Sequence, residues 1–541
     1  MTATKKSLRR RTAAVFALVA AGALALSACT VSSAPNPSDG PTEAGPQILS
    51  VASSASVTTW DPVRSFSTEA FYLGNVYETL LIRNPEGSAE EFTPGLAKSW
   101  EASADGLTWT FTLQDNATFH SGAPVDSAAV KASIEAAKEY AGASFIWLPL
   151  VSIDTPDDKT VVMNLDYAAP MDLIAASTYA AWIVEPSALA DSKDNEDYFE
   201  AGIDAGSGPF TVGSYRPGAE VVLEAAENYW KADNQPHYDT VSVQITPDAI
   251  TAQQMLTAGE VDLATNVPLE NVHSVAQQIG GEVRTANSPN NFVGFFNTQR
   301  PPLDNPKVRQ ALSYAIPYQD IIEVGAYGYA TQSRGPAPKG IFPYSDDVPQ
   351  YNYDLDKAKQ LLEAAGVSEG LELTLTYSSE NPNSTRFAPL IKDSFAQIGV
   401  EVTVRGMLWA DQWAAARENP AEAQDMFVVL YWPAYSDAGV DNLPELFGSW
   451  DGESKPFFNL SYWNNPAYDQ LIGEAAILSG SDRAAAQAKY VEAMTMLVDD
   501  APGFYLYDQQ AVQIVPPELN IAPFNENYPF TTFFASISPK A

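Results

Sequence analysis

The chain has 541 residues, a single cysteine and a formal net charge of −37. This charge excludes nucleic-acid binding through a basic surface, because DNA and RNA phosphates would be repelled. One cysteine also excludes a disulfide within the chain, so packing alone must hold the fold.

The first 28 residues have the pattern of a signal peptide. Five basic residues within the first eleven precede an apolar run over 13–26, which is shorter than the ~20 residues of a membrane-spanning helix. Leu26-Ser27-Ala28-Cys29 then matches the bacterial lipobox, in which the cysteine sulfur takes a diacylglycerol before cleavage. We therefore expect residues 1–28 to be removed and Cys29 to carry a lipid, although a lone cysteine can also be a small core residue. Both the Sec and the Tat export routes stay open.

A tether and a long body follow the lipobox. Residues 29–46 are rich in Ser, Pro and Gly, which is typical of a flexible linker. The body from residue 47 to 541 is too long for one hydrophobic core, so we expect two or three lobes.

The first half of the body predicts mostly strands. A strand is expected over 48–53, and a hairpin over 97–112 with its tight turn at Asp105-Gly106. Apolar residues alternate with threonines after this turn, which is the period of a half-buried strand. Residues 159–165 alternate in the same way.

The second half predicts alternating helices and strands. Asn305-Pro306 is typical of a helix start, and Asp354 of another start whose helix stops at Gly366. The elements that follow are a strand over 371–377, a helix over 384–398, a strand over 400–404 and a buried strand over 427–431. This order predicts an α/β lobe over 291–500.

Blocks of distinctive sequence run through the body in a fixed order. They cover residues 76–81, 94–101, 105–111, 119–122, 206–210, 228–230, 259–262, 296–298, 301–303, 308–316, 356–362 and 466–469. Together these blocks resemble the family 5 extracellular solute-binding proteins, which are the dipeptide, oligopeptide and nickel binders of ABC importers.

The resemblance implies an α/β, two-lobed, periplasmic-binding-protein-like fold of class II, cluster C, with an inserted subdomain. The base lobe is then expected to combine 47–65, 205–290 and 501–541. The inserted subdomain would cover 66–204, and the second lobe 291–500. The implied mechanism is closure of the lobes on a solute, which is then delivered to permease and ATPase subunits.

Candidate ligand-binding residues follow the strand at 427–431, because ligands of open α/β sheets bind beyond the carboxyl ends of the strands. In the peptide-binding members of the family, a loop tryptophan precedes by three residues an aspartate that pairs with the peptide's α-ammonium. Trp432 matches the tryptophan, but Tyr435 stands at the aspartate position. An unpaired buried ammonium is costly. Either Asp437 therefore serves after a small loop shift, or the ligand has no free α-amino group.

Further candidates come from other parts of the chain. Trp413 matches a second pocket tryptophan of the family, and Arg417 could bind a carboxylate in two-pronged fashion or lie on a solvated helix face. Tyr505 and Tyr507 lie where the chain recrosses to the base lobe, and Trp60 follows the first strand. Each of these aromatic residues could line the cleft or belong to the core.

Residues for catalysis or metal binding form no recognisable pattern. The three histidines, His120, His237 and His273, are far apart in the sequence, which disfavours a zinc site. HExxH, Walker, GxGxxG and G-x-S-x-G motifs are missing at plausible junctions. We therefore expect a binding protein that is not an enzyme and uses no metal or cofactor.

The expected function is capture of peptides by a monomeric, lipid-anchored protein on the outer face of the cytoplasmic membrane. It would serve an ABC importer and bind no nucleic acid. The alternative is the same role for an oligosaccharide, an opine-like conjugate or a nickel chelate, which Tyr435 favours. A surface hydrolase lacks catalytic residues here, and an adhesin has no need of a hinged fold.

Overall fold

The computed structural model describes residues 46–540 apart from 141, 194, 196, 368–369, 436 and 451–457. The expected signal peptide, Cys29 and the tether up to Gly45 lie outside the described residues. Within the described part, none of the helices has the length and apolar character needed to cross a bilayer.

A five-stranded sheet contains the first strand of the body. Its order is β11 (Leu263–Ala264), β1 (Ile48–Ser53), β10 (Thr240–Ile245), β9 (Glu220–Ala225) and β8 (Phe210–Arg216). β1 runs parallel to both of its neighbours, whereas β10, β9 and β8 pair antiparallel. Leu49 and Val51 are buried in one core and Ala52 in another, which confirms the predicted strand. Because β1 and β11 are parallel, their carboxyl ends share one edge of the sheet.

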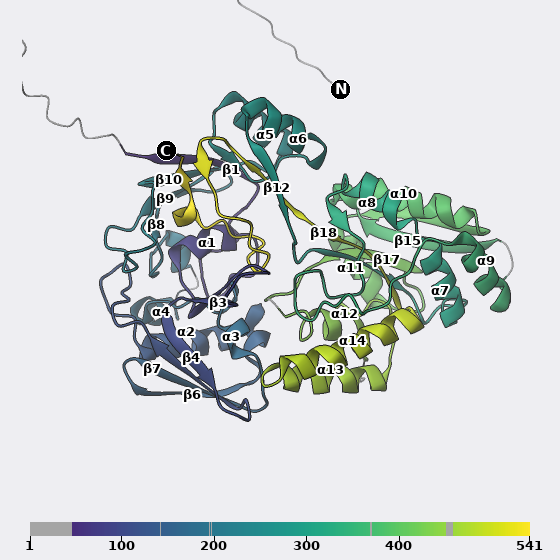
Figure 1. Ribbon diagram of the computed structural model, residues 1–541, viewed down its shortest axis with the longest axis horizontal. Coiled ribbons are helices and arrows are strands. Elements are labelled where there is room, and N and C mark those ends of the chain that lie inside the picture. Colours follow the sequence, from purple (N-terminus) through teal and green to yellow (C-terminus); the bar gives the residue numbers. More distant parts are fainter. Residues whose placement is uncertain are drawn as a thin grey trace, which may run out of the picture. The chain divides into compact units, whose positions relative to one another are not determined.

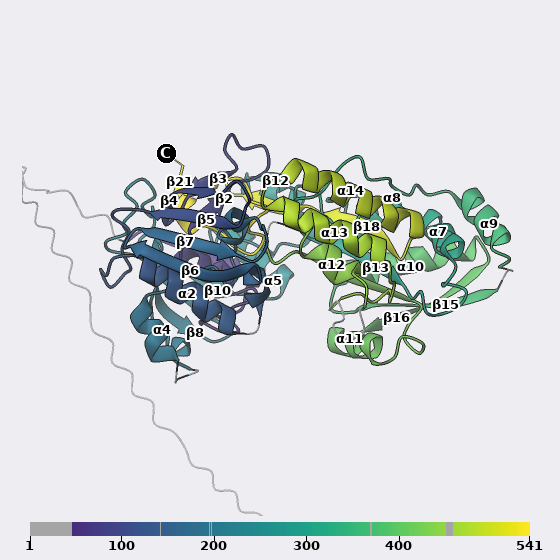
Figure 2. The ribbon, with the colours of Figure 1, turned by 90° about the horizontal axis from the view of Figure 1, so that it is seen from below.

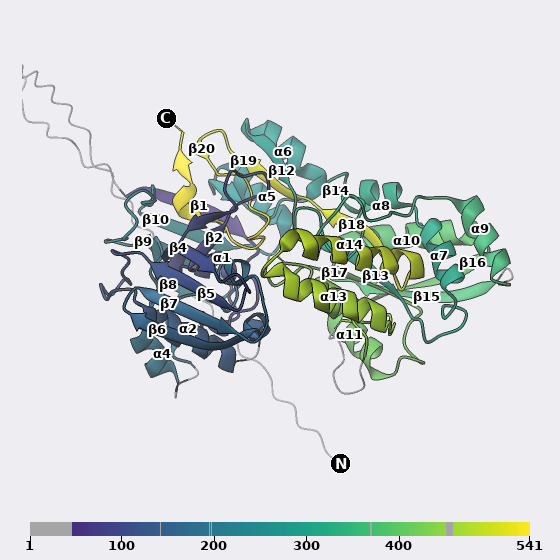
Figure 3. The same cartoon turned by 60° about the horizontal axis from the view of Figure 1, so that its bottom comes forward.

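Two helices and a two-stranded ribbon adjoin this sheet. They are α5 (Ala249–Ala258), α6 (Val272–Ile279), β12 (Glu282–Ala286) and β19 (Ala511–Val515) (Figure 3). Leu256, Val275 and Ile514 bury their side chains in the core that these elements share.

A four-stranded antiparallel sheet lies within residues 97–165. Its order is β4 (Ala97–Ala102), β5 (Thr108–Leu113), β7 (Thr160–Leu165) and β6 (Leu150–Asp157) (Figure 2). Trp109, Phe111 and Leu113 are buried, as the alternation predicts, and Gly106 makes the turn with a φ of +69°. Helix α2 (Ser127–Glu139) packs on this core through Val130 and Ile134.

A six-stranded sheet forms the centre of the predicted α/β lobe. Its order is β14 (Ala330–Thr331), β18 (Gly503–Gln509), β13 (Asn291–Phe296), β17 (Met426–Tyr431), β15 (Leu371–Ser378) and β16 (Val400–Met407). β17, β15 and β16 run parallel, which confirms the predicted βαβ order. Their carboxyl ends therefore meet at one edge.

Helices cover both faces of this sheet (Figure 1). One face carries α7 (Pro306–Tyr314), α8 (Tyr318–Gly325), α9 (Leu355–Ala364) and α10 (Pro382–Ala396). The other carries α11 (Trp409–Glu418), α12 (Asn442–Phe447), α13 (Pro466–Ser479) and α14 (Arg483–Asp500). Phe292 and Phe296 point into the first core, and Val293 and Phe295 into the second. The central strands are thus apolar on both faces.

The predicted helix starts are confirmed by their caps. The Asn305 side chain accepts a hydrogen bond from the Lys307 N–H, and the Asp354 carboxylate accepts one from the Lys357 N–H. Helix α10 starts at Pro382 rather than at 384, because Asn381 caps it and proline suits the first helical position.

The remaining elements are short. They are α1 (Ala70–Val76), β2 (Leu81–Arg83), β3 (Phe92–Pro94), α3 (Met171–Ile174), α4 (Pro186–Ser192), β20 (Leu519–Asn520) and β21 (Ser538–Pro539). Single turns of 3-10 helix span Ala143–Trp147, Phe199–Ala201, Leu269–Asn271 and Phe534–Ser536.

The chain passes twice between the β12–β19 ribbon and the six-stranded sheet, at 287–290 and after Gln509. We call 287–290 and 509–511 the crossing segments. A hydrogen bond connects the two crossing segments, since the Gln509 N–H donates to the Asn290 carbonyl at 2.9 Å. The base lobe was expected to resume at 501, yet β18 belongs to the six-stranded sheet. It pairs with β13 on one side and β14 on the other, so the chain recrosses about eight residues later than expected.

Candidate functional site

A cavity of about 1040 Å³, here called cavity 1, opens where β15, β16 and β17 end. This edge is where an open α/β sheet presents its loops to a ligand. The second lobe contributes Ser378, Glu380, Asn381, Pro382, Ser384, Trp409, Val428, Val429, Leu430, Tyr431, Trp432, Ala434, Asp441, Glu445 and Phe458. Residues 66–204 contribute Phe66, Gly142, Phe145 and Tyr179. The cavity is therefore walled by two parts of the chain that are distant in sequence.

Aromatic rings make up much of the wall of cavity 1. The Phe66 ring meets the Tyr179 ring edge to face at 5.0 Å, and Phe145 lies 6.3 Å from Phe66. On the opposite wall, Trp409 stacks on Trp413 at 5.5 Å. Such walls suit solutes with large apolar groups.

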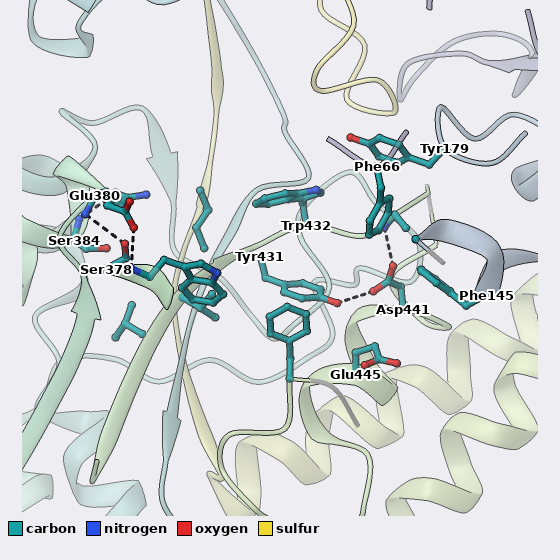
Figure 4. Close-up of a pocket in the computed structure, with 18 of the residues that line it drawn as sticks. Phe66, Phe145, Tyr179, Ser378, Glu380, Ser384, Tyr431, Trp432, Asp441 and Glu445 are labelled. Atoms are coloured by element: carbon teal, nitrogen blue, oxygen red, sulfur yellow. Dashed lines mark hydrogen bonds between the residues drawn. The ribbon is translucent and has the colours of Figure 1, made fainter. Parts of the chain in front are cut away.

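Asp441 supplies a carboxylate at one end of the cavity. The Tyr431 hydroxyl donates to Asp441 Oδ1 at 2.9 Å and the Ala434 N–H donates to Oδ2 at 2.7 Å (Figure 4). Burial raises the pKa of Asp441 to about 7, and the nearby Glu445 and Asp437 add to this rise. A carboxylate has about four acceptor positions, so Asp441 retains capacity for a ligand donor.

Glu380 supplies a second carboxylate at the other end. It lies with Ser378 and Ser384 on the side of the cavity away from Phe66 and Asp441 (Figure 4). Glu380 Oε2 accepts a hydrogen bond of 2.8 Å from the Trp409 N–H. Both ends of cavity 1 therefore present a carboxylate that the backbone holds in place.

Trp432 is the predicted residue that the structure places in the cavity wall. Its side chain is 39% exposed, and its ring lies 5.5 Å from Phe530. Trp413 lies one layer behind, against Trp409 and Phe458. The Arg417 guanidinium lies over the Trp413 ring at 4.9 Å and is not among the described residues that line cavity 1, so its role as a carboxylate partner stays a prediction.

Asp437 and Tyr435 do not line cavity 1 in this structure. Asp437 is completely buried; its Oδ1 accepts from the Gly439 N–H at 2.8 Å, and its Oδ2 has no hydrogen-bond partner among the described residues. Burial raises the pKa of Asp437 to about 6, although the Gly439 N–H, Arg483 and Arg83 oppose the rise. Tyr435 is buried in the core with Ala434. The loop turns the Asp437 carboxylate inward in this structure, and its role as an ammonium partner stays a prediction.

Trp60, Tyr505 and Tyr507 are core residues rather than cleft residues. Trp60 is 3% exposed and packs against Tyr72 and Tyr215 at 6.0 and 5.3 Å. Tyr505 and Tyr507 lie on β18, and both are buried in the cores between the sheet and its helices. Tyr505 and Tyr507 lie on a central strand that is covered on both faces, which leaves no side open to a cleft. None of the three residues lines cavity 1, and their ligand-binding role stays a prediction.

A second cavity of about 420 Å³, cavity 2, lies at the carboxyl ends of β1 and β11 beside the crossing segments. Its lining is rich in neutral hydroxyl and amide groups, including Ser53, Thr265 and Asn290. Phe530 lines cavity 2 and Trp432 lines cavity 1, so their ring contact marks where the two cavities adjoin.

The rule that ligands bind beyond the carboxyl ends of strands could have identified some of the cavity residues that the sequence analysis missed. Residues 371–377 and 400–404 were already predicted as strands, so Ser378, Glu380 and Trp409 could have been named as residues that follow their ends. No sequence signal places Phe66 or Tyr179 against the second lobe, because that contact is purely tertiary.

Several sequence blocks of the resemblance are structural. Glu78, in the block 76–81, is held by residues of two other blocks: its carboxylate accepts hydrogen bonds from Tyr229, Trp230 and Ser207 at 2.7–2.9 Å. Gly206 passes so close to Val76 that a Cβ would lie 2.0 Å from the Val76 carbonyl oxygen. These residues build the fold and do not touch a solute cavity.

The histidines and carboxylates form no metal site in the described residues, where no group of three or more His, Cys, Asp or Glu could hold an ion. His120 instead hydrogen-bonds to Asp204 at 2.8 Å and to the Gly208 carbonyl at 2.7 Å. Burial lowers the pKa of His120, but the Asp204 carboxylate, the Gly208 carbonyl and Glu78 together raise it overall. This pair stabilises the segment around Gly208.

Comparison with known proteins agrees with this architecture. Residues 91–453 match the family described as bacterial extracellular solute-binding proteins, family 5 Middle. The chain is 29% identical to the probable D,D-dipeptide-binding periplasmic protein DdpA of Escherichia coli over 80% of this chain and 82% of that one. It is also 29% identical to heme-binding protein A of Haemophilus influenzae, over 90% and 92% of the two chains.

A solved structure has the same fold. The periplasmic binding protein DppA of Helicobacter pylori, in complex with the peptide STSA, superposes with a TM-score of 0.74 at 24% identity, over 91% of this chain and 98% of that one. A two-lobed α/β fold with a cavity at the carboxyl ends of its strands fits a protein that binds a small solute. The chain belongs to the family 5 bacterial extracellular solute-binding proteins, which serve ABC transporters and are not enzymes.

Proposed function

We propose that this protein captures peptides in cavity 1 and delivers them to the permease of an ABC importer. Cavity 1 itself carries the proposal, because it lies at the carboxyl ends of three parallel strands and has walls from two parts of the chain. Its volume of about 1040 Å³ is at the upper end of the range for small-molecule sites, ~300–1,000 Å³. A short peptide with bulky side chains suits such a space. The relatives named for dipeptide binding support the same ligand class.

In this proposal the crossing segments act as the hinge. The base lobe then consists of 47–65, 205–290 and the stretch after Gln509, with 66–204 inserted and 291–509 as the second lobe. A solute that contacts Phe66 and Trp432 together binds the closed form better than the open form. The solute can shift the equilibrium between the open and closed forms only by this difference in affinity.

The proposal includes a lipid anchor on Cys29, which rests on the lipobox in the sequence. The anchor would hold the protein on the outer face of the cytoplasmic membrane. Mass spectrometry of the mature chain tests it: a lipidated N-terminal Cys29 is expected, and an unmodified Cys29, or a mature chain that begins elsewhere, would refute it.

The ligand class is tested by thermal unfolding with a pool of di- to pentapeptides, and separately with oligosaccharides, opine-like conjugates and nickel chelates. A ligand at a hundred times its dissociation constant adds about 2.7 kcal/mol to the stability of the form that binds it. This should raise the midpoint by roughly two degrees or more. A shift with peptides supports the proposal. A shift with another panel alone replaces the peptide by that solute.

A further inference from the structure

Cavity 2 has no charged residue among the described residues that line it. Asp, Glu, Lys and Arg make up 18% of the chain, yet the described lining of cavity 2 contains none of them and no histidine. Cavity 1 differs, because Glu380, Asp441 and Glu445 lie in its wall. The polar residues that line cavity 2 carry hydroxyl or amide groups instead, including Ser53, Ser288, Asn290, Gln510 and Gln513. Cavity 2 is therefore polar but uncharged.

Three acidic residues are neighbours of this lining in the sequence, and each is held by other groups. Glu69 Oε1 accepts hydrogen bonds of 2.9–3.1 Å from one hydroxyl and two backbone N–H groups of residues 65–67. Asp508 accepts hydrogen bonds of 2.6–3.0 Å from an amide, a hydroxyl and a backbone N–H of the second lobe. Glu526 accepts from the Glu86 N–H. All three acids are buried and none lines cavity 2, so the packing keeps their charges away from it.

The neutral groups of the lining retain capacity for further hydrogen bonds. The side-chain carbonyl oxygens of Asn290 and Gln513 have no donor among the described residues. The Ser53 hydroxyl accepts from the Ala55 N–H at 3.2 Å and from the Thr265 hydroxyl at 2.9 Å, and its own hydrogen meets no acceptor in the described chain. An unpaired polar group is costly, so a ligand that brings the missing partners is favoured. Hydroxyls and amides both donate and accept, whereas a carboxylate only accepts and an ammonium only donates.

Cavity 2 adjoins cavity 1, so one solute can reach both. Trp432 of cavity 1 meets Phe530 of cavity 2 at 5.5 Å, with the ring planes at 69°. Both cavities lie at the carboxyl ends of parallel strands, where open α/β sheets bind ligands. The volume of cavity 2, about 420 Å³, falls within the range of small-molecule sites, ~300–1,000 Å³.

We propose that cavity 2 is a second subsite for the solute of cavity 1, and that it selects an uncharged group with several hydrogen-bond donors and acceptors. In a peptide this group is the side chain of serine, threonine, asparagine or glutamine, and in a glycoside it is a sugar ring. A charged side chain is rejected, because it would leave water without a counter-charge. This inference rests on the proposed function, since it specifies a second part of the solute that cavity 1 captures.

Two series of tripeptides test this selectivity by calorimetry on the purified protein. One series is Phe-Phe-Xaa and the other is Xaa-Phe-Phe, where Xaa is glutamine, glutamate, lysine or methionine. The four side chains are similar in length and differ in charge and hydrogen bonding. In at least one series the glutamine peptide is expected to bind about tenfold tighter than the glutamate and lysine peptides, whose charges would be left without a partner. It should also bind tighter than the methionine peptide. Any other order in both series would overturn the inference.

A pair of glycosides separates this inference from the proposed function. Phenyl β-glucoside carries a ring for cavity 1 and neutral hydroxyls for cavity 2, and phenyl β-glucuronide adds a carboxylate to the same sugar. If the glucoside binds at least tenfold tighter than the glucuronide and no peptide binds, the peptide proposal fails while the neutral subsite stands. If the tripeptides bind without a preference for glutamine, the peptide proposal stands and the neutral subsite fails. Binding of none of these probes would overturn both.

A charge placed in cavity 2 locates the subsite. Gln510 lines cavity 2 and is partly exposed, so its side chain can be exchanged for a charged one of similar length. Gln510→Glu is expected to raise the affinity for the lysine peptide about tenfold and to lower that for the glutamate peptide, and Gln510→Lys to do the opposite. Gln254→Glu, exposed on α5 outside both cavities, is the control and should keep the wild-type order. An unchanged order in both Gln510 variants would overturn the assignment to cavity 2. If these variants do not fold, the tripeptide order in the wild type decides the question.

Discussion

Arg483 Nη2 lies 2.6 Å from Asp172 Oδ1, and this ion pair joins helix α14 of the second lobe to helix α3 of residues 66–204. The same guanidinium donates to Glu91 at 2.9 and 3.0 Å. One side chain therefore connects two parts of the chain that both wall cavity 1.

Replacement of Arg483 by methionine should lower the free energy of unfolding by about 2 kcal/mol, because it leaves the largely buried Asp172 without its partner. Denaturation with urea measures this loss. Lys98→Met is the matched control, since the Lys98–Asp115 pair is exposed to solvent and contributes little to stability. Equal losses in the two variants would show that the Arg483 bridge has no special role.

Gly480→Ala should destabilise the protein by about 1–3 kcal/mol, as overpacking does. A Cβ at this position would lie 2.3 Å from the Ala169 backbone nitrogen, so the two segments would have to separate. Gly473→Ala provides the control, because Gly473 lies in α13 with nothing within 4 Å of a Cβ. Gly473→Ala should stabilise by about 0.5–1 kcal/mol through helix propensity. Opposite signs of the two effects in thermal unfolding confirm the close approach.

The stability of the protein should fall as the pH rises from about 4 to 7. Burial raises the pKa of Asp437 to about 6 and that of Asp441 to about 7, from an ordinary value of 3.8. Glu445 adds to the rise for Asp441, and Arg483 and Arg83 oppose it for Asp437. The folded chain thus binds more protons than the unfolded chain in this window. The free energy of unfolding therefore decreases with pH there.

Asp437→Asn isolates one part of this effect. The variant keeps an oxygen to accept from the Gly439 N–H and replaces the unpaired Oδ2 by an amide. It should equal the wild type near pH 4 and exceed it at pH 8 by up to about 3 kcal/mol, since each pKa unit is worth 1.36 kcal/mol. Urea unfolding at the two pH values measures the difference. A variant that is less stable at pH 8 would contradict the prediction.

Trp432→Ala should lower solute affinity about tenfold or more while leaving stability nearly unchanged, because the half-exposed ring lines cavity 1. Trp60→Ala should lower stability while leaving solute affinity nearly unchanged. Its ring is buried in the core, so truncation costs about 3–5 kcal/mol of stability. Calorimetry and thermal unfolding of both variants separate the two roles. A loss of affinity only in a folded Trp60→Ala would restore the cleft role expected from its sequence position.

Strands and helix ends could be predicted because their causes are local. Trp109, Phe111 and Leu113 alternate with threonines, so only a strand places all three on one buried face. The side chains of Asn305 and Asp354 cap helices by accepting hydrogen bonds from backbone N–H groups two or three residues further along the chain. The resemblance also pointed to the family correctly. Its blocks include Glu78 and the residues that hold it, whose contacts stabilise the fold whatever the solute.

The loop from Trp432 to Asp441 shows where sequence reasoning stopped. Trp432 was found from the strand end, but Asp441 was missed, because only the direction in which each carboxylate turns decides which acid reaches the cavity. The Gly439 N–H holds Asp437 inward, whereas the Tyr431 hydroxyl holds Asp441 at the cavity wall. The spacing of residues along the chain does not show which way either carboxylate turns.

The sequence by itself determined the strand and helix pattern, the family and an acidic chain, since these follow from periodicity, local hydrogen bonding and composition. Only the tertiary structure decided which aromatic rings are core and which line a cavity. Phe66 and Tyr179 reach cavity 1 because residues 66–204 pack against the second lobe, with Arg483 and Gly480 at that contact. Burial and orientation are properties of the packed chain, because each side chain's surroundings come from segments hundreds of residues away.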